Sequence, residues 1–487
     1  MEVRKKFREW TPDQYVTESV SPADVLPEDD LVFFLLETIP RLDLAAFYAH
    51  YDGETRGAPP FNVPMMCTLL VYSYSIGVFS SRKIAAACER NLAFLAIVGS
   101  DRPDFRTISD FRKIHLDAFQ DLFVEVLRLA GEVGMVKLGN LALDGSKFKA
   151  NASRHKAMSY GYMTKEVERL RDEIRELTQQ AKQTDAEEDA ALGSRRGDEL
   201  PDELKRRRDR LAVIEEAMKR LEAQAQQKAE AEQRRRDEAE AKREAEGKKR
   251  RGRAAKPVDP TPEDKAQTNF TDPESKIMKT SNKGFDYCIN GQAVVDEAHQ
   301  IIVGADVTQD ANDKQQAGTM AKKTRETLEA AGIELPSDAG EAEAKEPQVE
   351  QQQGENNPLK GNGVPMSMDS GYFSEDAVGD VEREGFDPHI AVGRQKHNTS
   401  DPETAEGPPS ESLTTKERMA HKLRTPSGRA CYAKRKHIVE PVFGQMKHVR
   451  GFRQFLVRGI KKVRGEWNLL CLTHNLLKIW RYQCALT

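Results

Sequence analysis

Strand and helix patterns follow one another along this chain in an order that few folds share. The first strand segment is separated from the second by more than a hundred charged, helix-forming residues, and a four-residue turn joins the second to the third. The expected elements are, in order, strands at 136–144, 284–295 and 300–307, a helix at 313–331, a strand at 364–369, a helix at 374–383, a strand at 388–392, and helical periodicity from the region of Glu440 to Trp480. Polar residues at 396–428 are expected to form a loop.

This order predicts an α/β protein of the α+β type, with one mixed sheet. The first strand is expected at the centre, the strand at 364–369 beside it, and a late helix across both. Such an arrangement is that of a ribonuclease-H-like core. It would bring together residues that are distant in the sequence.

The long interruption between the first two strands is interpreted as a helical hairpin. Apolar residues step by three and four in two arms, and a break at 193–201 separates the arms. Such seams are typical of a coiled-coil-like antiparallel pair. The first arm carries Met163, Val167, Leu170, Ile174, Leu177 and Ala181, and the second carries Leu211, Ile214, Met218, Leu221 and Ala225. From 226 to 256 the seam fades into a solvated charged run.

The resulting domain plan has one core with interruptions. Its parts are a helical N-terminal domain at 1–135, the start of the catalytic core at 136–162, the inserted hairpin at 163–256, the continued core at 257–335, a disordered acidic linker at 336–363, and the rest of the core with C-terminal helices at 364–487. In the N-terminal domain, helix starts are expected at Ser80 and at Thr107–Ser109. The short helices suit DNA binding by a helix-turn-helix-like unit, and packing alone explains them equally well.

The distribution of charge and cysteines along the chain indicates what kind of protein it is and in which compartment it is expected. The net charge is -4, but residues 415–465 hold 15 Lys and Arg against two acidic residues, as an enzyme acting on a polyanion needs. The alternative is a solvated basic helix. Six scattered cysteines without a Cys-x-x-Cys pair argue against zinc or disulfides and for a reducing cytoplasm. No apolar run reaches the length of a membrane span.

Three acidic residues stand at the points where the expected elements would converge. Asp144 and Asp369 each end a short apolar strand, and Glu440 lies in the basic segment. Three carboxylates without His or Cys suit Mg²⁺, with Mn²⁺ as an alternative, and a pair of such ions supports phosphodiester chemistry. Rival carboxylates, interpreted as turn or surface residues, are Asp286, Asp296, Asp306 and Asp310; His389 and His437 are interpreted as packing or phosphate-contacting residues.

Several blocks resemble the bacterial insertion-sequence DDE transposases, in the branch with an N-terminal helical domain and a Tyr-Arg-Glu-Lys signature. The blocks are Pro103–Arg112, Leu141–Ser153, Met278–Asp310, Met366–Ser374 and Tyr432–Trp480. The resemblance implies that Asp144, Asp369 and Glu440 hold the metal, as a two-ion site in the family's manner. It also implies that Tyr432, a basic partner and Lys447 contact transposon-end DNA.

The basic partner has two candidates because Tyr432 and Glu440 are eight residues apart. Arg435 keeps the family's spacing from the Tyr, whereas Lys436 lies four residues before Glu440 and would share its helical face. Geometry favours Lys436 beside the Glu, with Arg435 as a phosphate contact. Pro441 must either kink the helix or begin a new one.

The leading hypothesis is a DNA transposase that cleaves terminal inverted repeats and joins the freed 3′ hydroxyl to target DNA. Its partner is double-stranded DNA, on which it is expected to form a homodimer or a higher oligomer, with no membrane. The expected location is the bacterial cytoplasm, at the nucleoid. The alternatives are a ribonuclease-H-like nuclease without strand transfer and a non-catalytic coiled-coil DNA-binding protein. The hairpin arms could serve dimerisation or contact with DNA.

Overall fold

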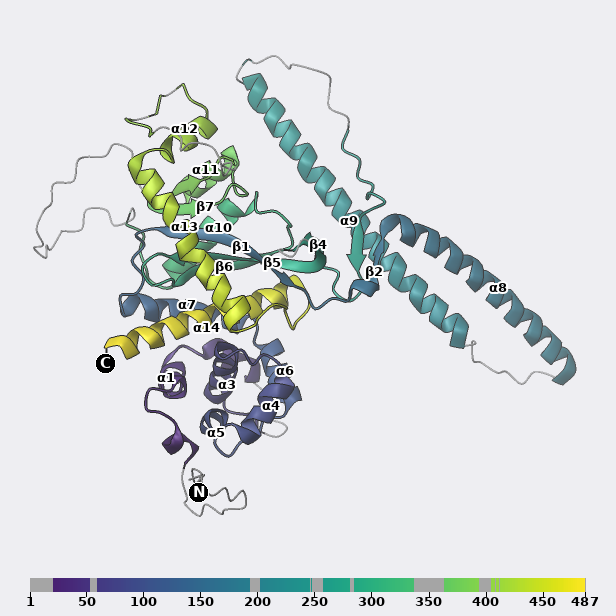
Figure 1. The fold of residues 1–487 in the computed structure, drawn as a ribbon. Coiled ribbons are helices and arrows are strands. Elements are labelled where there is room, and N and C mark those ends of the chain that lie inside the picture. The colour runs from purple at the N-terminus through teal and green to yellow at the C-terminus, as the bar shows by residue number, and fades with distance from the viewer. Residues whose placement is uncertain are drawn as a thin grey trace, which may run out of the picture.

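The computed structural model combines a helical N-terminal part, a mixed sheet covered by helices on both faces, and a long projecting hairpin (Figure 1). It describes residues 21–52, 59–192, 202–245, 247, 257–280, 284–336, 363–393, 404–407, 409–410 and 412–486. Most of the expected linker at 336–363 and the end of the charged run at 226–256 lie outside the described residues. Every described helix is too short or too polar to cross a membrane.

The N-terminal part is built from short helices, as the sequence predicts. They are α1 (Leu31–Thr38), α2 (Ala45–Tyr48), α3 (Val63–Ser75), α4 (Ser81–Arg90), α5 (Leu92–Val98), α6 (Phe105–Ile114) and α7 (Ala118–Glu132). The expected start at Thr107–Ser109 is wrong: α6 begins at Phe105 because the Asp104 carboxylate accepts a hydrogen bond from the Thr107 N–H at 2.7 Å. Ser80 precedes α4 as predicted but makes no capping bond with its side chain.

The sheet has six strands with the first of them at its centre. They are β1 (Leu141–Lys149), β4 (Lys276–Lys279), β5 (Phe285–Asp296), β6 (Ile302–Thr308), β7 (Val364–Met368) and β8 (Phe386–Ile390). β1 pairs antiparallel with β5 and parallel with β7, β8 follows β7, and both β4 and β6 pair with the far side of β5. The predicted central position of the first strand, with the strand at 364–369 beside it, is confirmed.

The expected end of the first strand at Asp144 is wrong. β1 continues to Lys149 because β5 pairs with it residue for residue from Leu141 onward. Gly145 permits this continuation, since a Cβ there would lie 2.2 Å from Gln292 Nε2 and 2.8 Å from Asp313 Oδ1. Asp144 therefore lies within a strand, with its side chain on the face opposite to the one that Gly145 presents.

Helices cover both faces of this sheet. α10 (Gln316–Ala330) lies on one face, where Thr324 fills the space over Gly304, and packs beside α11 (Glu375–Arg383). On the other face α13 (Pro426–Gly444) crosses β1, and α14 (Ile460–Leu486) places Trp467 against Gly291 (Figure 1). Phe443 of α13 stacks on Trp467 at 6.3 Å between ring centroids, which ties the two helices together.

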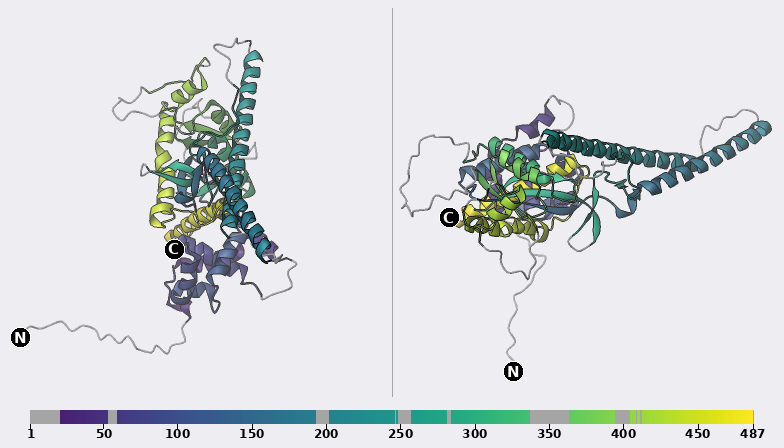
Figure 2. Two further views of the ribbon diagram at one scale, coloured as in Figure 1. Left: turned by 90° about the vertical axis from the view of Figure 1, so that its right-hand side faces the viewer. Right: turned by 90° about the horizontal axis from the view of Figure 1, so that it is seen from above.

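Two long helices occupy the interruption between β1 and β5. α8 (Tyr160–Leu192) and α9 (Asp202–Ala245) enclose an apolar cluster separate from the main core, and they project away from the sheet (Figures 1 and 2). Arginine–glutamate pairs cross between them, among them Arg171–Glu215, Arg207–Glu173 and Arg210–Glu166. At their base β2 (Ala157–Ser159) pairs with β3 (Gln267–Asn269). The chain thus buries much of the predicted heptad seam within its own hairpin.

The C-terminal third departs from two expectations. The polar stretch at 396–428 contains a helix, α12 (Thr415–Lys422), started by a capping box between Thr414 and Glu417. The helical periodicity from Glu440 to Trp480 is broken after a π-helical turn, η5 (Gln445–Val449), by an extended segment between Gly451 and Gly459, both at positive φ.

Pro441 neither ends α13 nor starts a new helix. Without an N–H, it leaves the carbonyl of His437 short of its helical donor. The side-chain amide of Gln300 donates to that carbonyl at 3.0 Å, so a residue of the β5–β6 turn replaces the missing bond. Of the two alternatives, the restart at Pro441 is therefore wrong, and Glu440 lies inside a continuous helix.

A buried polar network joins the N-terminal helices to α14. Glu466, fully buried, accepts hydrogen bonds from the Tyr74 hydroxyl at 2.6 Å and from the Leu456 N–H at 2.8 Å. Arg112 donates in turn to Tyr74 and to the carbonyl of Phe79. Because a buried carboxylate is costly unless its oxygens are bonded, this network fixes the helical domain to the core.

Candidate active site

Asp144 lies half-buried on the central strand, under α13. Its Oδ1 accepts a hydrogen bond from the Gly145 N–H at 2.8 Å, and its Oδ2 lies 3.4 Å from Nη1 of Arg435. Burial raises the pKa of Asp144 to about 6, and the carboxylates of Asp369 and Asp313 act in the same direction, whereas Arg435 and the Gly145 N–H lower it. Asp144 therefore lies near two other carboxylates and one guanidinium.

Asp369 follows the last residue of β7 and begins a tight turn. Its Oδ1 accepts a hydrogen bond from the Gly371 N–H at 2.7 Å. A Cβ on Gly371 would lie 2.9 Å from this oxygen, so a larger residue would crowd the Asp369 carboxylate, and it would lie in ordinary contact with Oδ2 of Asp313 at 3.9 Å. The parallel pairing of β7 with β1 is what brings Asp369 and Asp144 to one region of the sheet.

A third carboxylate, Asp313, was missed from the sequence, where it marks the start of an expected helix. It lies between β6 and α10 and reaches the site from the face opposite to α13. Its Oδ1 accepts hydrogen bonds at 2.7 Å from the side-chain amides of Asn290 and Gln292. A signal was available: these two amides alternate on one face of an otherwise apolar strand.

Gln292 links Asp313 to the turn that carries Asp369. With its Nε2 bound to Asp313, its Oε1 accepts a hydrogen bond from the Tyr372 hydroxyl at 2.5 Å, and the Tyr372 N–H donates to the Asp369 carbonyl. Burial, together with the three nearby aspartates, raises the pKa of Tyr372. Asp313 therefore supports the turn that carries Asp369. Beside it, Oδ1 of Asn290 is buried and has no partner among the described residues.

The two candidate basic partners of the glutamate take different positions on α13. Arg435 is buried and contacts Asp144, whereas Lys436 is exposed. Tyr432 lies one turn before Lys436; burial raises the pKa of its hydroxyl, Arg435 lowers it, and Asp369 and Asp144 raise it. The side chain of Arg435 thus lies between the phenol of Tyr432 and the carboxylate of Asp144.

Glu440 is exposed on α13 and stands apart from the aspartates. It lies five residues after Arg435, about 140° around a regular helix from the side that meets Asp144. Its carboxylate makes no hydrogen bond or ion pair with a described residue, and within the described ranges no three His, Cys, Asp or Glu side chains form a group ready to hold a metal. The structure brings Asp144 and Asp369 together and leaves Glu440 outside.

Lys447 lies on η5 and reaches back to β1. Its Nζ donates to Ser146 Oγ at 2.5 Å and to the Lys147 carbonyl at 2.7 Å, and it lies 4.3 Å from the centre of the Phe148 ring. Burial lowers the pKa of Lys447 to about 8. This places a cation two residues along the strand from Asp144.

The rival carboxylates have structural partners. Asp286 pairs with Lys149 and Arg154, and Asp306 pairs with Arg464. Asp296 accepts backbone N–H groups at the β5–β6 turn, and Asp310 accepts from the Gln316 amide. The interpretation as turn or surface groups holds for Asp310, which is exposed, and for Asp296, which lies at the β5–β6 turn. It is wrong for Asp286, which is buried within β5, and for Asp306, which is half-buried within β6.

Comparison with known families gives two matches, one in the N-terminal helices and one in the C-terminal part of the chain. Residues 20–114, from η1 (Pro22–Val25) to α6, match the family described as Transposase domain (DUF772). Residues 406–480, which include α12, α13 and most of α14, match the family described as Transposase DDE domain. Comparisons with curated proteins and with solved structures found no significant match. Both matching family models describe transposase domains, so the chain is consistent with an insertion-sequence DDE transposase.

Proposed function

We propose that this chain is a DNA transposase with a ribonuclease-H-like catalytic core, which cleaves transposon ends and joins them to target DNA. The observation that carries the proposal is the position of two acidic residues. Asp144 lies on the central strand, and Asp369 follows the parallel strand beside it, under a helix that belongs to a matched transposase segment. That strand order is the one expected of such a core.

The donor set fits a divalent cation such as Mg²⁺ or Mn²⁺. The candidate ligands Asp144, Asp369 and Glu440 offer only carboxylate oxygens, which these hard ions prefer. The raised pKa of Asp144, caused by burial and by neighbouring carboxylates, describes a site whose negative charge a bound cation would stabilise. When bound, two such ions would activate water or a 3′ hydroxyl and neutralise charge on the leaving oxygen.

The surrounding residues would align the DNA. Arg435 offsets the charge of Asp144 in the free protein and can exchange that carboxylate for a phosphate. Lys447 holds Ser146 within β1, and a phosphate partner would offset the burial that lowers the pKa of Lys447. Tyr432 and the exposed Lys436 would contact the transposon end. Glu440 is proposed as the third ligand on the family resemblance, which requires it to turn toward the aspartates when DNA and cations bind.

The test uses the DNA that flanks the coding region, where terminal inverted repeats are expected. Asp144→Asn and Glu440→Gln should each lower end cleavage in Mg²⁺ by roughly a thousandfold or more while leaving end binding intact. Glu382→Gln, at an exposed position on α11, is the matched control. A Glu440→Gln protein that still cleaves at the parent rate would exclude Glu440 as a ligand. Joining of a precut end to a plasmid distinguishes transposition from nuclease activity alone.

A further inference from the structure

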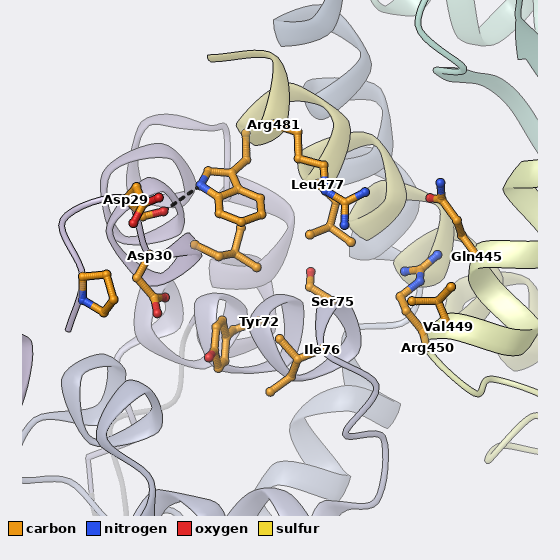
Figure 3. A pocket seen from close by; sticks show the side chains of 13 residues that line it. Asp29, Asp30, Tyr72, Ser75, Ile76, Gln445, Val449, Arg450, Leu477 and Arg481 are labelled. Carbon is orange, nitrogen blue, oxygen red and sulfur yellow. Dashed lines mark hydrogen bonds between the residues drawn. The ribbon is translucent and has the colours of Figure 1, made fainter. Parts of the chain in front are cut away.

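A pocket of about 550 Å³ lies where the N-terminal helices meet α14, and neither Asp144 nor Asp369 lines it. It is lined by residues of α1, α3, η5 and α14 (Figure 3). Ile76 and Val449 also line it and are 43% and 78% exposed, so the pocket opens to solvent. Its polar lining is divided, with acidic groups at one end and basic groups at the other.

Arg450 provides the first basic group, and its charge is not balanced by the protein. The side chain is 7% exposed; Nη1 donates to Thr473 Oγ1 at 2.7 Å and to the Leu470 carbonyl at 3.4 Å. Nη2 has no partner, and Arg450 forms no ion pair with any carboxylate in the described part of the chain. Burial, with a smaller contribution from Arg481, lowers its pKa to about 10.

Arg481 provides the second basic group, from the exposed side of α14. Figure 3 shows the side chains of Arg450 and Arg481 on the same side of the pocket, with the Gln445 amide nearby. Asp29 and Asp30 lie at the opposite side in this view, and Oδ1 of Asp30 is occupied by the Val32 N–H at the start of α1. In the described part of the chain no ion pair joins Asp29 or Asp30 to Arg450 or Arg481.

We infer that the basic end of this pocket is a binding site for a phosphate group. A buried guanidinium without an anionic partner is costly, so a chain that keeps one beside a second guanidinium and an open pocket is built to receive an anion. Phosphate suits the pair because guanidinium groups bind its oxygens with two parallel hydrogen bonds.

The phosphate can come from a DNA backbone or from a free phosphate compound. The backbone source rests on the proposed function, and it is favoured by the position of the pocket on η5, the same turn that carries Lys447 beside β1. The site itself does not rest on that function. The two sources are distinguished by separate measurements.

The first measurement is thermal unfolding of the full chain with and without 10 mM inorganic phosphate, with chloride holding the ionic strength constant. Phosphate should raise the apparent Tm of the parent by roughly 2–5 °C. Arg481→Ala should lose at least half of this rise, and Arg450→Met all of it. Lys461→Ala, an exposed substitution on the same helix outside the pocket lining, should respond as the parent does. Equal rises in all four proteins would overturn the inference.

Arg450→Met also tests the unbalanced charge directly. In buffer without phosphate it should unfold at or above the parent temperature, because it removes a buried charge that has no partner. If this variant does not fold, the comparison of Arg481→Ala with Lys461→Ala decides the question alone.

The second measurement is binding of duplex DNA over a range of salt concentrations. If the pocket takes a backbone phosphate, Arg481→Ala should reduce the salt dependence by about one counterion relative to the parent and to Lys461→Ala. A stabilising effect of phosphate with an unchanged slope would assign the site to a free phosphate compound. A parent protein that binds no DNA would contradict the proposed function and leave the thermal result to decide the pocket.

Discussion

The bond from Gln300 to the His437 carbonyl can be tested by exploiting the proline that makes it necessary. Pro441→Ala restores an N–H that can donate to His437 within α13, and Gln300→Ala removes the substitute donor. If Gln300 replaces the bond that Pro441 cannot make, its removal should matter in the parent and matter less once the helix has its own donor. The two substitutions should therefore be coupled.

The expected magnitudes follow from the contacts. A neutral hydrogen bond contributes about 1 kcal/mol. Gln300→Ala should therefore destabilise the parent by about that amount, together with the free energy contributed by the hydrogen bond from Lys478 to Gln300. Pro441→Ala should stabilise by up to about 3 kcal/mol. In the Pro441→Ala background the destabilisation caused by Gln300→Ala should be smaller by roughly 0.5–1 kcal/mol. The Lys478 contact and the positive φ of Gln300 are common to both backgrounds and cancel.

The assay is urea unfolding followed by the fluorescence of Trp467, which stacks on Phe443 of α13 and so reports on this helix. Replacing Trp10 and Trp480 with Phe leaves Trp467 as the single indole among the three of the chain. The four members of the cycle are compared in this background. If Gln300→Ala lowers the free energy of unfolding equally in the parent and in the Pro441→Ala protein, then Gln300 does not replace the helical hydrogen bond that Pro441 cannot make.

Three further predictions concern the site and the buried network. Asp313→Ala should lower cleavage and Mn²⁺ affinity about tenfold or more, because the support of the Asp369 turn is lost, whereas Asp313→Asn keeps an acceptor and should stay within about threefold. Calorimetry and single-turnover cleavage measure both, and an Asn variant as poor as Ala would show that the charge matters instead. Tyr74→Phe should destabilise the chain by about 1.5–3 kcal/mol in urea, since buried Glu466 loses a donor, and an unchanged midpoint would contradict this. Burial lowers the pKa of His115 to about 4, so between pH 6.5 and 4 the unfolded chain binds a proton that the folded chain does not. The free energy of unfolding should therefore decrease as the pH falls from 6.5 to 4. His115→Phe should make this decrease smaller.

The order of elements could be predicted from the sequence because strands and helices leave different periodicities. The β5–β6 hairpin, β7 and the position of Asp369 after it all follow from local pattern. The end of β1 could not be predicted in the same way, since Asp144-Gly-Ser is typical of a turn. Its continuation depends on pairing with β5, which is more than a hundred residues away in the sequence.

The two missed features differ in kind. The start of α12 carries a recognisable capping box, Thr414 with Glu417, within a stretch whose polar composition favours a loop. The role of Asp313 has no local signal at its own position, because its partners Asn290 and Gln292 lie on another strand. Glu440 stays a prediction: its helix is as expected, but its side chain is not gathered with the aspartates.

The hairpin of α8 and α9 has a consequence for how the chain can fold. β1 and β5 pair along the whole of β1, although residues 150–284 separate them, and such a distant pairing is slow to find. Because the hairpin has its own apolar cluster, and β2 pairs with β3 at its base, it can form first and bring its two ends together. About 25 residues of loop then remain to be closed in place of about 135, which lowers the entropic cost by about 1.5 kcal/mol. The projecting insertion thereby brings β1 and β5 close together before they pair, so that the two strands are separated by only a short loop.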